Sequence, residues 1–189
     1  MSTEKSTAQD VVSAGLITFP KSGDSASAGG VYTVTCVGPD GVEKWSDTFH
    51  NLVVNQGLQD MNDKYFKASG YTAVWYLGLV TGPGSGTTYA ASDTLSSHAG
   101  WTENTSYTGS RKTVTFGTPT TADPSVISNS ASPSAFSITG TATIAGAFLA
   151  STTDNSGVLF SAGDFTGGDK SVASGDTLNV TYQFSLDAA

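Results

Sequence analysis

The sequence predicts a mainly β protein: a two-sheet β-sandwich or jelly-roll-like domain with a single short α-helix. Several segments alternate apolar and polar residues, which is the period of a β-strand. The 22 glycines and 6 prolines supply turns between these segments. Only one stretch, at about residues 55–67, has helical spacing. A chain of 189 residues can bury one sizeable core, so we expect a β-sandwich domain over residues 31–189 and a flexible N-terminal arm over residues 1–30.

The arm is rich in Ser, Ala, Gly and Thr and contains one apolar island, within residues 15–20. Three apolar side chains of this island are the candidate partner contacts: Leu16, Ile17 and Phe19. Such a composition orders poorly by itself. Two interpretations remain open, because the island can add a strand to a neighbouring sheet, in this or another molecule, or form an ordinary edge strand of the domain.

A hairpin follows the arm. Residues 31–37 alternate strictly, residues 38–41 (GPDG) predict a tight turn, and residues 42–49 form the partner strand. Cys36 lies on the apolar face of the first strand, where we expect a buried, unreactive thiol. As the chain's single cysteine, it excludes an internal disulfide.

The predicted helix begins at Asn55, whose side chain can cap it. Its apolar residues share one face by their spacing of i, i+3 and i+7: Leu58, Met61 and Tyr65. We expect this face to pack against the next strand, residues 73–80, which is almost continuously apolar and therefore central. Leu58 should then be a buried core residue.

The remaining strands follow from alternation or apolar runs. They are predicted at residues 111–118, 136–148, 157–165 and 178–186. The second of these is the longest period-2 series in the chain. The last is regular enough to hold the C-terminus in a sheet.

Residues 87–109 form a long segment without a clear period, in which Tyr89, Trp101 and Tyr107 are spaced among Ser, Gly and Asn. Long loops of this kind are often functional. We favour a lid whose aromatic side chains cover the sheet, and the alternative is a contact surface.

The sequence contains one short internal similarity. Residues 91–95 (ASDTL) are similar to residues 174–178 (SGDTL). Five residues can coincide by chance, so we predict no structural repeat.

Catalytic and metal-binding patterns are missing from the sequence. His50 and His98 have no neighbouring carboxylate motif, and we expect His98 to order its loop by hydrogen bonding. The acidic segments at Asp154 and at residues 164–169 lack the spacing of a calcium loop and are predicted to be turns. We therefore predict no catalytic residues, no metal, no cofactor and no enzymatic activity.

The composition also limits the partners. Charged residues make up only 13% of the chain and its net charge is −8, whereas nucleic-acid binding normally needs a basic surface. No apolar run has the length of a membrane span, and the first residues lack the apolar core of a signal peptide. We expect neither nucleic acid nor a membrane as partner.

Several segments together resemble a family of small structural (virion) proteins of tailed bacteriophages, similar to head decoration or cement proteins. These segments are residues 42–45, 51–58, 71–79, 90–101, 146–149 and 174–178. The resemblance covers roughly residue 31 to the C-terminus. It implies a virion structural protein without separating head from tail, and it assigns no active residue.

From this resemblance we expect a capsid decoration protein that stabilises the head by binding the major capsid protein. Its partners would be that protein, copies of itself in a homo-oligomer, or both. Its location would be the virion, after assembly in the host cytoplasm. A charge-poor, hydroxyl-rich surface fits close packing of identical copies. The alternative is a tail-associated or host-adhesion protein that uses residues 87–109 as its contact surface, and a cytoplasmic hydrolase is a distant third.

Overall fold

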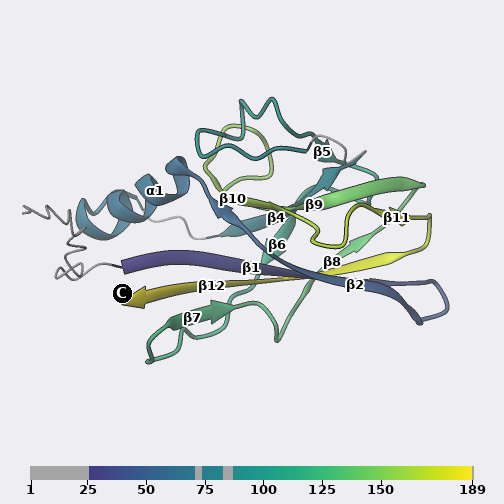
Figure 1. Ribbon diagram of the computed structural model, residues 1–189, viewed down its shortest axis with the longest axis horizontal. Helices are drawn as coiled ribbons and strands as arrows, with labels where there is room; N and C mark the ends of the chain where they lie inside the picture. Colours follow the sequence, from purple (N-terminus) through teal and green to yellow (C-terminus); the bar gives the residue numbers. More distant parts are fainter. Residues whose placement is uncertain (1–25, 71–73, 83–86, 189) are drawn as a thin grey trace, which may run out of the picture.

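The computed structural model describes residues 26–70, 74–82 and 87–188. They form a two-sheet antiparallel β-sandwich with a short helix at one end, as Figure 1 shows. The predicted fold class is confirmed. The core lies between the sheets, and a second, smaller core lies on the outer face of one sheet.

The first sheet is built on the two longest strands among the described residues. Its order is β2 (Glu43–His50), β1 (Ala26–Val37), β12 (Thr177–Ala188) and β7 (Ser125–Ser128), with β8 (Ser134–Ser137) also paired to β12. The predicted hairpin is confirmed, since β1 and β2 are joined at Gly41, whose N–H bonds Gly38 O at 2.9 Å. Gly41 has φ +78°, a conformation that suits glycine.

The second sheet surrounds two buried central strands. Its order is β3 (Leu52–Val53), β10 (Leu159–Asp164), β9 (Ala142–Ala150), β4 (Trp75–Thr81) and β5 (Glu103–Asn104), with β11 (Lys170–Val172) on β9 and β6 (Lys112–Val114) on β4. The apolar run at residues 73–80 thus becomes β4, a central strand as predicted.

The alternating series at residues 136–148 is not one strand, and this prediction was wrong. Phe136 belongs to β8 in the first sheet, whereas residues 142–150 form β9 in the second. Phe136 and Ile144 face the same core although the chain changes sheets near Gly140, whereas Phe148 faces the second, smaller core. In β9 every residue from Ile144 to Ala150 is buried, because both faces of the strand are covered.

β1 begins at Ala26, which is earlier than the boundary at residue 30 that the composition suggested. Residues 26–30 pair with the last residues of β12, from Ala26↔Ala188 to Gly30↔Phe184. This pairing uses backbone groups and needs no apolar side chains, so the composition of the segment did not reveal it. At Gly30 a Cβ would lie 2.5 Å from the Tyr182 hydroxyl, so glycine allows that ring to pack against β1.

The helix α1 (Asn55–Phe66) is confirmed in place and length, but the prediction of its N-cap was wrong. Val54 occupies the capping position without a side-chain hydrogen bond, and Asn55 is already helical. Gln56 instead attaches the helix to the sheet, because its Oε1 accepts a hydrogen bond from Leu159 N at 2.9 Å. The first turn is therefore held by β10 rather than by a capping side chain.

The predicted packing face of α1 was also wrong. Leu58 is 42% exposed and Tyr65 is 84% exposed, and only Met61 packs against the core. The buried helical residue is Gly57, where a Cβ would lie 2.4 Å from Phe160 O. Helix and strand backbones meet at this glycine, and Leu58 and Tyr65 are consequently left exposed.

Gly57→Ala should destabilise the protein even though alanine favours helices by roughly 0.8–1.0 kcal/mol. Because the new methyl group would meet backbone rather than a movable side chain, we expect a net loss of about 1–3 kcal/mol. Urea unfolding monitored by circular dichroism measures it. The unfolding free energy of the neighbouring variant Leu58→Ala should stay within about 0.5 kcal/mol of wild type. A larger loss of stability for Leu58→Ala than for Gly57→Ala would contradict this attachment.

Cys36 should be unreactive in the folded protein. The residue is fully buried, and burial raises the pKa of its thiol to about 11, so the thiolate is scarce at pH 8. An aromatic disulfide reagent should titrate no thiol per chain at pH 8 without denaturant and one thiol in guanidinium. Rapid reaction of the native protein would place Cys36 outside the core.

Candidate binding groove

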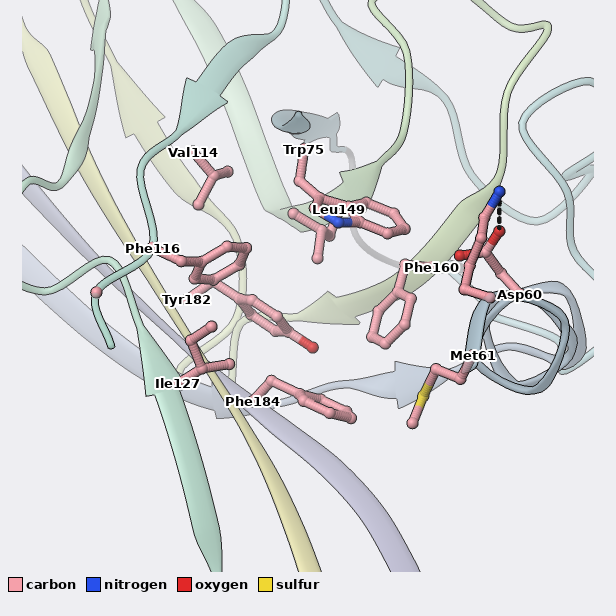
Figure 2. A pocket seen from close by; sticks show the side chains of 12 residues that line it. Asp60, Met61, Trp75, Val114, Phe116, Ile127, Leu149, Phe160, Tyr182 and Phe184 are labelled. Atoms are coloured by element: carbon pink, nitrogen blue, oxygen red, sulfur yellow. Dashed lines mark ion pairs between the residues drawn. The ribbon is translucent and has the colours of Figure 1, made fainter. Parts of the chain in front are cut away.

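An apolar groove of about 500 Å³ opens at the end of the sandwich, between α1 and the two sheets. Figure 2 shows Met61, Trp75, Phe160 and Phe184 directed toward this opening. Twelve residues line it: Asp60, Met61, Lys64, Trp75, Val114, Phe116, Gly117, Ile127, Leu149, Phe160, Tyr182 and Phe184. Its volume and apolar walls are typical of ligand or segment binding sites.

Strand alternation places the aromatic floor of the groove. Tyr182 and Phe184 are two residues apart on β12 and so point to the same side of the sheet. Phe160 of β10 contacts Phe184 edge to face, with ring centroids 5.3 Å apart, and contacts Trp75 of β4 at the same distance. The floor therefore joins both sheets.

Polar groups are few inside the groove and lie at defined positions. The Tyr182 hydroxyl accepts a hydrogen bond from Asn51 Nδ2 at 3.1 Å and is also bonded to Ser161. Burial raises the pKa of Tyr182, which stays neutral at physiological pH. Asp60 and Lys64 form an ion pair at 3.7 Å on the helix side. The groove thus suits an uncharged, apolar occupant.

Large apolar side chains remain exposed on or next to the elements that line the groove. Tyr65 and Phe66 at the end of α1 are 84% and 77% exposed and contact each other edge to face. Leu58, Val74 and Leu186 are also exposed, and the latter two are close in sequence to the groove residues Trp75 and Phe184. Exposed apolar groups on elements around a groove suit an interaction surface.

The predicted contact residues Leu16, Ile17 and Phe19 lie outside the described residues. The structure does place the point at which the chain enters the sandwich. β1 begins at Ala26 at the end of the molecule where α1 lies and where β12 finishes, as Figure 1 shows. The groove and the start of the described chain therefore share one end.

The long segment at residues 87–109 is a lid on the second sheet, as favoured above. Trp101 is buried against Phe148, donates a hydrogen bond from Nε1 to Asp93 Oδ2 at 3.0 Å, and stacks with His98. His98 Nδ1 also lies 3.0 Å from Trp101 O, so it orders the loop as predicted. With Tyr107 likewise buried, two of the three aromatic side chains of this segment are not available to a partner.

Arg111 fastens the lid, and the sequence did not reveal this role. The side chain is buried, and its guanidinium makes two hydrogen bonds to the Glu103 carboxylate, at 2.9 and 2.7 Å. It also donates to Thr152 O at 3.1 Å and lies over the Phe148 ring, 5.0 Å from its centroid. The residue looked like the first of an alternating strand, and its partners are up to 44 residues away.

The short similarity between residues 91–95 and residues 174–178 corresponds to one type of local turn that occurs twice. Ala90 N–H donates to Asp93 Oδ2 at 3.1 Å, and Ala173 N–H donates to Asp176 Oδ2 at 2.9 Å. In each case the leucine two residues after the aspartate is buried. The similarity reflects a shared turn that directs a leucine into a core, not a repeated domain.

Other acidic residues also serve turns. Asp154 Oδ1 accepts hydrogen bonds from the N–H and the hydroxyl of Ser156, as its predicted turn requires. Within residues 26–70, 74–82 and 87–188, no three His, Cys, Asp or Glu side chains gather closely enough to hold a metal ion. The one helix of these ranges has neither the length nor the apolar character to cross a membrane.

Comparison of the chain with protein-family models, with curated proteins and with solved structures gave no match. The resemblance to phage structural proteins therefore stays a prediction.

Arg111→Ala should destabilise the protein by about 3–5 kcal/mol, because it leaves the Glu103 carboxylate and a backbone carbonyl without their buried partner. Chemical denaturation measures the loss, and increased protease cleavage within residues 87–109 should accompany it. Lys67→Ala, which breaks an exposed pair with Asp63 on α1, should cost no more than about 0.5 kcal/mol. Equal effects of the two changes would mean that Arg111 does not hold the lid.

Proposed function

We propose that the chain is a non-enzymatic virion structural protein of a tailed bacteriophage, a capsid decoration (cement) protein that stabilises the head by binding the major capsid protein. The observation that carries this proposal is the apolar end of the sandwich, where the groove, the exposed side chains of α1 and the start of β1 meet. A surface of this kind suits lasting contact with another protein.

The outer face of the first sheet supports the proposal, because it carries hydroxyl groups that bond to one another. Thr33 and Thr48 are paired across β1 and β2 with their hydroxyl oxygens 3.1 Å apart, and Thr35 and Ser46 are paired at 3.2 Å. A face without a cluster of like charges allows identical copies to lie close together. This fits a homo-oligomer in a lattice.

The buried charged side chains support a structural rather than a catalytic role. Arg111 is bound by Glu103, Asp176 by Lys44 at 2.7 Å, and Asp93 by Trp101 and a backbone N–H. Each interaction ties together segments that are separate in sequence or closes a turn. These groups are therefore engaged in holding the fold.

Host adhesion has less support than decoration. It would use residues 87–109 as contact surface, yet Trp101 and Tyr107 of this segment are directed into the protein. We propose that the apolar end, rather than the lid, makes the principal contact.

The experiment is co-sedimentation of the purified chain with emptied heads of the phage that encodes it and, separately, with host cells. A decoration protein should bind heads saturably, at a number of copies set by the capsid lattice, and raise their melting temperature. Binding to cells but not to heads would replace decoration by adhesion.

Deletion of residues 1–20 tests the contribution of the arm. We expect a folded domain with nearly unchanged circular dichroism and weakened binding to heads, because the deletion removes Leu16, Ile17 and Phe19 but leaves β1 intact. Full occupancy of heads by the truncated chain would place the whole interface on the sandwich. Unfolding of the truncated chain would instead assign the island to its own core.

A further inference from the structure

The apolar stripe of α1 is covered only in part. Leu58, Met61 and Tyr65 lie on one helical face by their spacing, but only Met61 packs against the core. The helix is held to β10 elsewhere, through Gly57 and Gln56. Of this stripe, Met61 lines the groove, while Leu58 and Tyr65 stay exposed outside its lining.

The opposite wall of the groove is an extension of the first sheet. Ile127 and Phe184 lie opposite each other on β7 and β12, and Gly30 is the β1 partner of Phe184. Further along the same face, Leu186 is 40% exposed and pairs with Ala28. The helix side, made by Met61 and the Asp60–Lys64 ion pair, thus faces the apolar sheet extension across a floor of Trp75, Phe160 and Tyr182.

We propose that this groove binds the apolar island of the chain's own N-terminal arm, with Leu16, Ile17 and Phe19 seated between α1 and the extension of β12. The inference does not depend on the proposed function, since it concerns the free protein. The island is uncharged from residue 15 to residue 20, as the interior of the groove requires.

The length of the connecting chain favours the chain's own arm over that of a second copy. Ala26 precedes the groove-side residue Gly30 by four strand residues, a distance of about 13 Å. Residues 19–26 can span up to roughly 23 Å when extended, so the arm can turn back and reach the groove. A tethered segment has an effective concentration in the millimolar range, which a second copy reaches only at high protein concentration.

Docking would cover two sets of apolar side chains at once. It would cover the apolar side chains that line the groove together with those of the island. In a particle the same island could exchange this site for a capsid surface, so the free protein would keep its contact residues covered until a head is present.

Disulfide trapping in the full chain tests the proposal. Phe19→Cys combined with Met61→Cys should form, under mild oxidation, a cross-linked monomer, which is recognised by its faster migration on a non-reducing gel. The cross-link should form at least about tenfold faster than in the control pair. Phe19→Cys with Ile127→Cys, on the opposite wall, provides a second pair in case the first disturbs α1. Native Cys36 is fully buried and does not compete.

The matched control is Phe19→Cys with His50→Cys. His50 is exposed, pairs with Val31 and is thus a similar distance along β1, but Phe49 before it points inward, so His50 faces away from the groove. Cross-linking at the control rate would overturn the proposal. Cross-linked dimers in place of monomers would also overturn it, in favour of arm exchange between copies.

A second measurement uses a fluorescent dye that binds exposed apolar surface. Replacing Leu16, Ile17 and Phe19 by serine should uncover the groove and raise dye fluorescence severalfold, whereas replacing Val11 and Val12 by serine should leave it unchanged. No rise with the island variant would show that the island does not cover the groove. Because neither measurement involves heads or cells, failure here is separate from failure to bind a capsid.

Discussion

The pairing of β1 with β12 is the interaction on which the rest of the structure depends. The two strands pair in register from Ala26↔Ala188 to Val37↔Thr177 and bring the first and last described strands together. β2, β7 and β8 all join this pair, so the whole first sheet is assembled on it. The pair also sets Tyr32 beside Tyr182, with ring centroids 4.6 Å apart, at the centre of the main core. The floor of the groove continues directly from this core through Phe184.

The attachment of α1 explains why the end of the sandwich stays open. A helix that packed its apolar stripe on the sheet would close the groove and bury Leu58 and Tyr65. Contact through Gly57 brings the helix backbone against Phe160 and leaves Leu58 and Tyr65 exposed. Apolar surface left uncovered in this way gains nothing for the stability of the isolated sandwich, and this is why the groove is the best candidate for a binding site.

The second sheet shows the opposite solution, because both of its faces are covered. Trp101 of the lid packs on Phe148 of β9, and Arg111 secures the lid through Glu103 and Thr152. The chain has few charged residues, and one buried guanidinium with several hydrogen-bond partners holds this long loop in place. The two sheets thus differ in kind, one exposing hydroxyl groups to solvent and the other enclosed.

The sequence by itself determined the fold class, the hairpin at residues 38–41, the position of the helix, the central strand β4 and the C-terminal strand. These features depend on local periodicity and turn residues, which contacts far along the chain do not alter. It also singled out the residues of the helix stripe and assigned Met61 to the core correctly, but Leu58 and Tyr65 wrongly. Only the tertiary structure decided which helix face meets the sheet, because the close approach at Gly57 requires Phe160, more than one hundred residues away. The same holds for the change of sheets near Gly140, the partners of Arg111 and the groove itself. Each is made by side chains from strands distant in sequence, and local spacing carries no information about which of these strands become neighbours.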